Sequence, residues 1–211
     1  MGFTAVAVLG GIVLGLICGG RPSNLAAANL RWPLALTVGV IAQWVPELLD
    51  ASEGTAFGLV VLSYVALAAF AIANLRMVGM PVVLVGLVLN MLVIGLNGGM
   101  PVRSDAVLAA GLADTAEEVE RMDFGAKRHL EDDDDVLTLL GDVVPVRALG
   151  EVLSFGDLVL SVGVADLLFR LLKPVRGRRR RTFELPEHVS DAVVIDLRSE
   201  PVMADAPRVA S

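Results

Sequence analysis

Two aspartates, Asp142 and Asp157, could do acid–base chemistry together. Asp142 lies in the segment LGDVVP, and Asp157 lies in SFGD at the start of the last apolar stretch. Two carboxylates that lie close together can share a proton and divide the acid and base roles, as in the aspartic proteases. Ser154 followed three residues later by Asp157 is also a capping box, which would open a helix. The sequence leaves both interpretations open, because it does not show whether the two carboxylates meet.

Other polar residues lie near the ends of apolar stretches. Gln43, Glu47 and Asp50 share one face of a helix, and so do Asn90 and Asn97, which are seven residues apart. Ionisable groups at membrane depth are costly and usually face a bundle interior or a water-filled cavity. These residues therefore predict a polar cavity for a small ligand. The alternative is that Glu47 and Asp50 simply reach the membrane interface.

The segment NGGMPV, residues 97–102, is a sharp exit from an apolar stretch. Its two glycines permit positive φ angles, which close a helix, and they would also let the backbone approach a ligand closely. The candidate ligand-binding residues at this exit are Asn97, Gly98, Gly99, Met100 and Pro101. A helix stop followed by a turn explains every one of these residues as well.

No metal site and no cofactor are expected. A single cysteine, Cys18, cannot supply the roughly four ligands of a zinc site. His129 stands before the acidic run 131–135, which lacks the spacing of a calcium loop and is typical of a solvated surface. Asp166 and Arg170 are four residues apart with the acid first, so they predict a structural ion pair.

Five apolar stretches must position these residues. Of the 211 residues, 55% are hydrophobic and 19% are charged, and the charges fall mainly in 103–151 and 173–211. A hydrocarbon core of about 30 Å requires about 20 apolar residues per helix. The stretches predict an all-α integral membrane protein with a five-helix transmembrane bundle within residues 1–174. The expected helices cover about 3–20, 33–50, 56–75, 81–97 and 152–172.

The basic residues predict an orientation. Arg21, Arg31, Arg76 and Lys173 lie in alternate connections or after the last stretch, and cytoplasmic loops carry such an excess of Lys and Arg. We therefore expect a plasma-membrane protein with its N-terminus outside and its C-terminus in the cytoplasm. The loop 98–151 holds 13 acidic and 5 basic residues and predicts a partly helical extracytoplasmic cap, with a helix that starts after Asp114.

The basic residues of the tail and the small residues of the first helix predict further contacts. The tail 175–211 begins with a basic run and is predicted to be disordered in the cytoplasm. It would contact anionic lipid headgroups through Arg178, Arg179, Arg180 and Arg181; no nucleic-acid partner is expected. Gly11, Gly15 and Gly19 form a small-residue stripe, which we expect to pack within the molecule.

Three motifs together resemble an uncharacterised family of bacterial multi-pass membrane proteins, domain-of-unknown-function family 5317, common in actinobacteria and firmicutes. The motifs are NGGMPV, LGDVVP and SFGD, and the resemblance covers about residues 1–174. It implies that the family's characteristic core includes Asn97, Gly98, Met100, Pro101, Asp142, Gly156 and Asp157. It implies no activity. A weaker likeness to signal peptidase II is not sufficient for recognition. The segment SFGD of this chain lacks the Asn of that family's motif, and the NxxDR element of that family has no counterpart in this sequence.

Three functions remain open. The leading hypothesis is a non-enzymatic membrane protein that binds a small ligand or lipid in a cavity open to the outside. The second is a membrane hydrolase that uses Asp142 and Asp157. The third is a transporter or channel component, which is disfavoured because five spans do not divide into inverted repeats.

Overall fold

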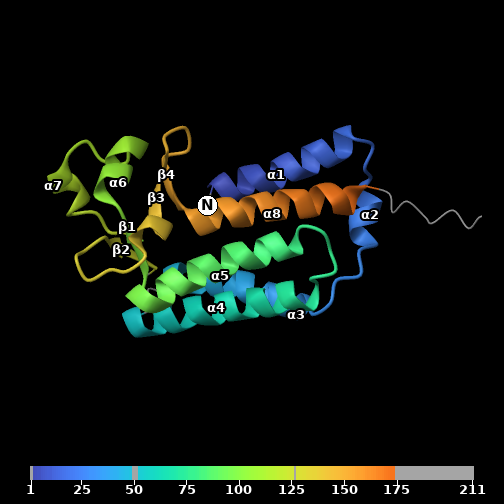
Figure 1. Cartoon of the computed structure of the whole chain (residues 1–211), viewed down its shortest axis with the longest axis horizontal. Helices are drawn as coiled ribbons and strands as arrows, with labels where there is room; N and C mark the ends of the chain where they lie inside the picture. The colour runs from blue at the N-terminus through green and yellow to red at the C-terminus, as the bar shows by residue number, and fades with distance from the viewer. Residues whose placement is uncertain (1, 49–51, 126, 174–211) are drawn as a thin grey trace, which may run out of the picture. The chain divides into compact units, whose positions relative to one another are not determined.

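The computed structural model describes residues 2–48, 52–125 and 127–173 (Figure 1). Asp50 and the basic tail with its predicted lipid contacts lie outside the described residues, and so does the side chain of Glu47.

Long helices lie at all five apolar stretches. They are α1 (Gly2–Ile17), α3 (Pro33–Leu48), α4 (Glu53–Ala73), α5 (Met80–Asn97) and α8 (Phe155–Leu172). A shorter helix, α2 (Pro22–Ala26), connects α1 to α3. The largest shift from the expected limits is three residues, such as the start of α8 at 155 in place of 152.

Two of these helices fit a membrane span by length and composition. They are Gly54–Ala73 within α4 and Met80–Asn97, which is α5. Only 28% and 39% of their apolar windows are buried inside the protein. The apolar segments Gly2–Ile17 of α1 and Pro33–Pro46 of α3 are shorter than the 18 residues of a candidate span. The structure therefore gives two candidate spans among the described residues, where the sequence predicts five.

The five long helices pack as a series. α1 lies along α8, α8 along α5, α5 along α4, and α4 along α3 (Figure 1). Glycine makes the close contacts possible, because a Cβ on Gly11 would come within 2.5 Å of the Ala165 carbonyl oxygen, and one on Gly86 within 2.6 Å of the Leu160 nitrogen. The backbones of α1 and α5 thus both approach α8 directly.

The predicted intramolecular packing of the glycine stripe is confirmed at two of its three positions. Gly11 and Gly15 both face α8. Gly19 does not: it has a φ of +83° and no atom within 4 Å of an added Cβ. Gly19 therefore lies in the turn after α1, where its positive φ is needed, and Gly20 makes the third close contact, with Leu172.

A small sheet corrects the all-α prediction. Its strands β1 (Met100–Val102), β2 (Arg128–Leu130), β3 (Asp142–Val146) and β4 (Glu151–Ser154) lie in the order β2-β1-β3-β4. β1 is parallel to both β2 and β3, whereas β3 and β4 form an antiparallel pair. The strands have only three to five residues, and β1 pairs with partners 28 or more positions later, so they leave no alternating pattern in the sequence.

Two short helices complete the cap that the segment 98–154 forms. α6 (Ser104–Ala110) and α7 (Ala116–Val119) contribute buried apolar side chains that pack with Val102 of β1 and Val152 of β4. The helix expected after Asp114 is present, but Thr115 caps it by accepting a hydrogen bond from the Glu118 nitrogen. The cap thus has a hydrophobic core of its own.

Asn74 fixes the chain at the end of the helices farthest from the cap. Its side chain is buried, donates to the carbonyls of Arg31 and Phe70, both at 2.8 Å, and accepts from the Arg31 nitrogen at 2.9 Å. We expect Asn74→Ala to lower the free energy of unfolding by about 1–3 kcal/mol, because it removes three hydrogen bonds to buried and partly buried backbone groups. Thr37→Ala, which removes one exposed hydrogen bond within α3, is the control and should cost less than about 0.5 kcal/mol. Equal losses in the two variants, measured by unfolding in detergent, would contradict this role.

Candidate functional site

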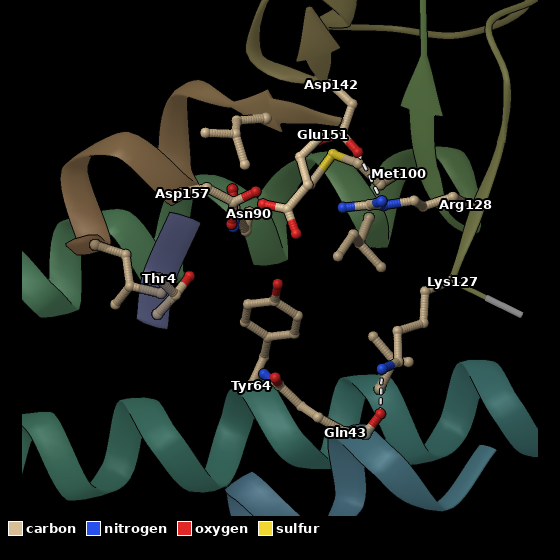
Figure 2. Close-up of a pocket in the computed structure, with 14 residues that line it drawn as sticks. Thr4, Gln43, Tyr64, Asn90, Met100, Lys127, Arg128, Asp142, Glu151 and Asp157 are labelled. Atoms are coloured by element: carbon tan, nitrogen blue, oxygen red, sulfur yellow. Dashed lines mark hydrogen bonds and ion pairs between the residues drawn. The ribbon is translucent and has the colours of Figure 1, made fainter. Parts of the chain in front are cut away.

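A cavity of about 180 Å³ lies where the helices meet the sheet (Figure 2). Every long helix contributes to its lining: Thr4 from α1, Gln43 from α3, Tyr64 from α4, Asn90 from α5 and Asp157 from α8. The cavity therefore depends on the whole arrangement of helices and on the cap above them.

The cap supplies most of the charge in the cavity. Its charged side chains there are Lys127, Arg128, Asp142 and Glu151. Apolar side chains, among them Val60 and Ile94, line the rest of the wall together with Met100. The cavity is therefore polar on the side of the sheet and partly apolar on the side of the helices.

Asp157 is held by a closed set of hydrogen bonds at the start of α8. Its Oδ1 accepts from Asn90 Nδ2 at 2.8 Å, and its Oδ2 accepts from the Ser154 nitrogen at 3.4 Å. Ser154 Oγ accepts from the Asp157 nitrogen at 2.9 Å and donates to Asn90 Oδ1 at 2.9 Å. The capping-box prediction is therefore confirmed, and the same carboxylate also borders the cavity.

Gly156 makes this arrangement possible. A Cβ at this position would lie 1.8 Å from Asn90 Oδ1 and 2.9 Å from the Gly86 carbonyl oxygen. The absence of a side chain at 156 therefore leaves the space that the Asn90 side chain occupies.

Sheet pairing brings Asp142 to the same cavity. In the pairing of β3 with β4, Asp142 lies opposite Ser154, the residue that caps α8. Its side chain is only 1% exposed and forms an ion pair with Arg128, from Nε to Oδ2 at 2.9 Å. Within the described residues, neither Asp142 oxygen receives a hydrogen bond of regular geometry, so the contact with Arg128 is ionic.

The surroundings of Asp142 favour its protonated form. Burial raises the pKa of Asp142 to about 7; the Arg128 guanidinium opposes that rise, and the negative charge of Asp157 adds to it. The two aspartates singled out in the sequence thus border one cavity and interact electrostatically. Near neutral pH the Asp142 carboxyl is poised to gain or lose a proton.

Two further side chains connect the cap to the helices at either end of the series. The Glu151 carboxylate accepts from the nitrogens of Gly2 and Phe3, at 2.6 and 2.9 Å, at the start of α1. Burial acts to raise the pKa of Glu151, but these hydrogen bonds and the N-terminal amine lower it to about 2. Lys127 Nζ donates to the Gln43 carbonyl of α3 (Figure 2). The cap therefore holds both α1 and α3.

Most residues of the NGGMPV exit lie elsewhere. Met100 lines the cavity, but Asn97, Gly98, Gly99 and Pro101 do not. The side chain of Asn97 instead exchanges two hydrogen bonds with the Val136 backbone, each 2.9 Å long. Gly98 closes α5 with a φ of +72°, as the turn interpretation requires.

A Cβ on Gly99 would meet His129 Nδ1 at 2.9 Å, and Pro101 is buried in β1 opposite His129. His129 itself pairs with Asp135, from Nε2 to Oδ1 at 2.9 Å. In the part of the chain that the structure describes, no group of three or more His, Cys, Asp or Glu residues is placed to hold a metal ion. The predicted ion pair of Asp166 with Arg170 is confirmed, at 2.8 Å.

Sequence reasoning missed several residues of the cavity. The candidate residues predicted from the sequence do not include Lys127 and Arg128, because the partners of both side chains lie far away in the sequence. Tyr64 is the only tyrosine in the chain and stands within an apolar stretch, a signal that could have identified it. Its hydroxyl points into the cavity (Figure 2).

Comparison with known proteins identifies the family. No curated protein and no solved structure shows a significant match to the chain. A family model, described as "Family of unknown function (DUF5317)", matches residues 27–169, which is more than half of the chain. The match includes the three motifs on which the resemblance rests, and the chain therefore belongs to this family of unknown function.

Proposed function

We propose that the protein is an integral membrane protein in which all five long helices cross the bilayer, with the cap outside the cell. The support comes from apolar side chains that face away from the protein. Ile17 of α1 is 75% exposed, and Leu34 and Leu48 of α3 are 78% and 80% exposed. The helices α4 and α5 are also mostly unburied and stand far from the N-terminus, unlike the core helix of a soluble protein or a signal sequence.

Cysteine labelling tests the proposed orientation. Starting from Cys18→Ser, Asp133→Cys places a thiol in the cap, and Arg76→Cys places one between α4 and α5. A membrane-impermeant maleimide added to intact cells should label the first variant and should label the second only after lysis. The reverse pattern, or labelling of both in intact cells, would contradict the proposal.

We also propose that the cavity binds a small polar ligand from the outside. The observation that carries this proposal is Asp142, a carboxylate that is 1% exposed at the wall of a cavity and has no hydrogen bond to either oxygen within the described residues. A buried charge lowers stability unless it is well compensated. A ligand that donates a hydrogen bond to Asp142 would supply the missing interaction.

Calorimetric titration of the purified full chain tests ligand binding. The probes are phosphoethanolamine, glycerol 3-phosphate, serine and glucose, which differ in charge but are all small and polar. At least one should bind the wild type, and Asp142→Asn should weaken that binding by about tenfold or more. Asp166→Asn, which alters an ion pair away from the cavity, should bind like the wild type. Binding of none of the probes, or equal binding in Asp142→Asn, would refute the proposal.

A hydrolase remains a second candidate because of one observation. Burial raises the pKa of Asp142 to about 7, and the negative charge of Asp157 adds to the rise, so the Asp142 carboxyl can take up and release a proton near neutral pH. Such an enzyme would require both groups. Asp142→Asn and Asp157→Asn should then each lower hydrolysis of a fluorogenic ester or peptide in micelles by about a hundredfold or more. A wild type that cleaves neither substrate would eliminate this candidate.

A further inference from the structure

We infer that the ligand of this cavity is the zwitterionic head of a membrane phospholipid, whose acyl chains leave the protein between α1 and α3. The inference rests on the proposed cavity function and specifies its ligand. It follows from the order of the helices, from the charges in the cavity, and from the apolar surfaces beside it.

The helix series has two ends, and both ends reach the cavity. α1 packs along α8, and α3 packs along α4, but within the described residues α1 and α3 share no extended contact with each other. Even so, Thr4 of α1 and Gln43 of α3 both line the cavity. The series must therefore curve around the cavity, and the side between α1 and α3 is the one that no packed pair of helices closes.

The charges in the cavity match a head that carries both signs. Lys127 and Arg128 lie in one part of the lining, and Asp157 lies across the cavity beside Asn90 (Figure 2). A phosphate fits the cations, because Arg and Lys are the usual phosphate-binding side chains. An ammonium group fits the carboxylates. A head with a phosphate alone would bring further negative charge close to Asp157 and the other carboxylates, whereas the ammonium group of a zwitterion offsets that charge.

Size and apolarity point to a head with chains attached. A cavity of about 180 Å³ is large enough for a small polar head and too small for acyl chains as well. On the helix side, Tyr64 and Leu160 line the cavity and also pack against the apolar core between α4, α5 and α8. Both helices that border this side expose apolar side chains, such as Leu9 of α1 at 60% and Ile41 of α3 at 56%. Acyl chains attached to the head would therefore meet apolar side chains once they lie outside the helices.

Three water-soluble probes test the inference on the purified full chain in detergent. Dihexanoyl phosphatidylethanolamine has the zwitterionic head and short chains, dihexanoyl phosphatidylglycerol has the same chains and an anionic head, and glycerophosphoethanolamine has the zwitterionic head alone. The first should bind about tenfold more tightly than either of the others. Arg128→Gln should weaken its binding by a similar factor, and Asp166→Asn should leave it unchanged.

A photoactivatable phosphatidylethanolamine with a diazirine in its acyl chain locates the chains. In vesicles of phosphatidylethanolamine and phosphatidylglycerol, cross-links in the parts of α1 and α3 next to Thr4 and Gln43 should decrease with excess dihexanoyl phosphatidylethanolamine or in Arg128→Gln. Cross-links near Val85, which is 52% exposed on α5, should persist as ordinary lipid contacts.

Each contrary result has a distinct meaning. If glycerophosphoethanolamine binds as tightly as the lipid, the cavity binds a small ligand and the phospholipid inference is wrong. If phosphatidylglycerol binds equally well, the zwitterionic head is wrong. Cross-links that resist competition everywhere would exclude a chain path between α1 and α3. If none of these probes or the small solutes binds, both the cavity function and this inference are refuted.

Discussion

Gly156→Ala should destabilise the protein by about 3 kcal/mol, the upper part of the range for overpacking a close contact. The new methyl group would lie 1.8 Å from Asn90 Oδ1, and Asn90 cannot turn away without losing its hydrogen bonds to Asp157 and Ser154. The Gly86 carbonyl, at 2.9 Å, limits movement of the backbone as well. Unfolding of the purified protein in detergent, followed by circular dichroism, measures the loss.

A glycine with open space supplies the matched control. Gly95 lies in α5 and has no atom within 4 Å of an added Cβ, so Gly95→Ala should be neutral or stabilising by up to about 1 kcal/mol. Gly156→Ala should also cost less in an Asn90→Ala background, since the clashing amide is then absent. Equal costs with and without Asn90, or similar effects at positions 95 and 156, would show that the contact is not the cause.

The second large effect is a dependence of stability on pH through Asp142. The pKa of this carboxyl is about 7 in the folded protein, against about 3.9 for an unfolded aspartate. The folded state thus holds the proton more tightly. The contribution of Asp142 to the free energy of unfolding is therefore greatest below about pH 4, and it falls by about 4 kcal/mol as the pH rises to about 7.

Asp142→Asn removes this titration, so the free energies of the wild type and the variant should diverge as the pH rises from about 4 to about 7. Above about pH 7 the difference should stay constant. Asp166→Asn, which alters the ion pair with Arg170, controls for a general change in charge. Curves for the wild type and Asp142→Asn that run parallel over this interval would show that the Asp142 pKa is not raised.

The helices could be predicted from the sequence because each is a local feature. An apolar run longer than about 15 residues, bounded by Gly, Pro or charge, indicates its own position, and Pro33 and Pro81 mark helix starts in the sequence itself. The sheet could not be predicted. Its strand Met100–Val102 pairs with residues 28 or more positions later, and nothing in MPV or RHL specifies that pairing.

The same difference between local and long-range features applies to the residues of the cavity. Asp142, Asp157 and Asn90 were singled out because carboxylates and amides beside apolar stretches are costly unless they have a partner. The partner itself could not be predicted, since Arg128 meets Asp142 only through the β2-β1-β3 order of the sheet. Asn97 was also predicted to bind a ligand because it is polar, and the sequence does not indicate the partner that its side chain has in the structure, the Val136 backbone.

The packing of α1 along α8 has a consequence for biosynthesis. α1 is synthesised before the other helices of the bundle, but its main neighbour is α8, the last of them in chain order, and its first turn is held by Glu151, which is also translated late. If the helices cross the bilayer as proposed, α1 remains there with its glycine face uncovered until nearly the whole described chain has been synthesised. Nascent chains that end before residue 155 should leave α1 loosely held and open to membrane proteases or chaperones.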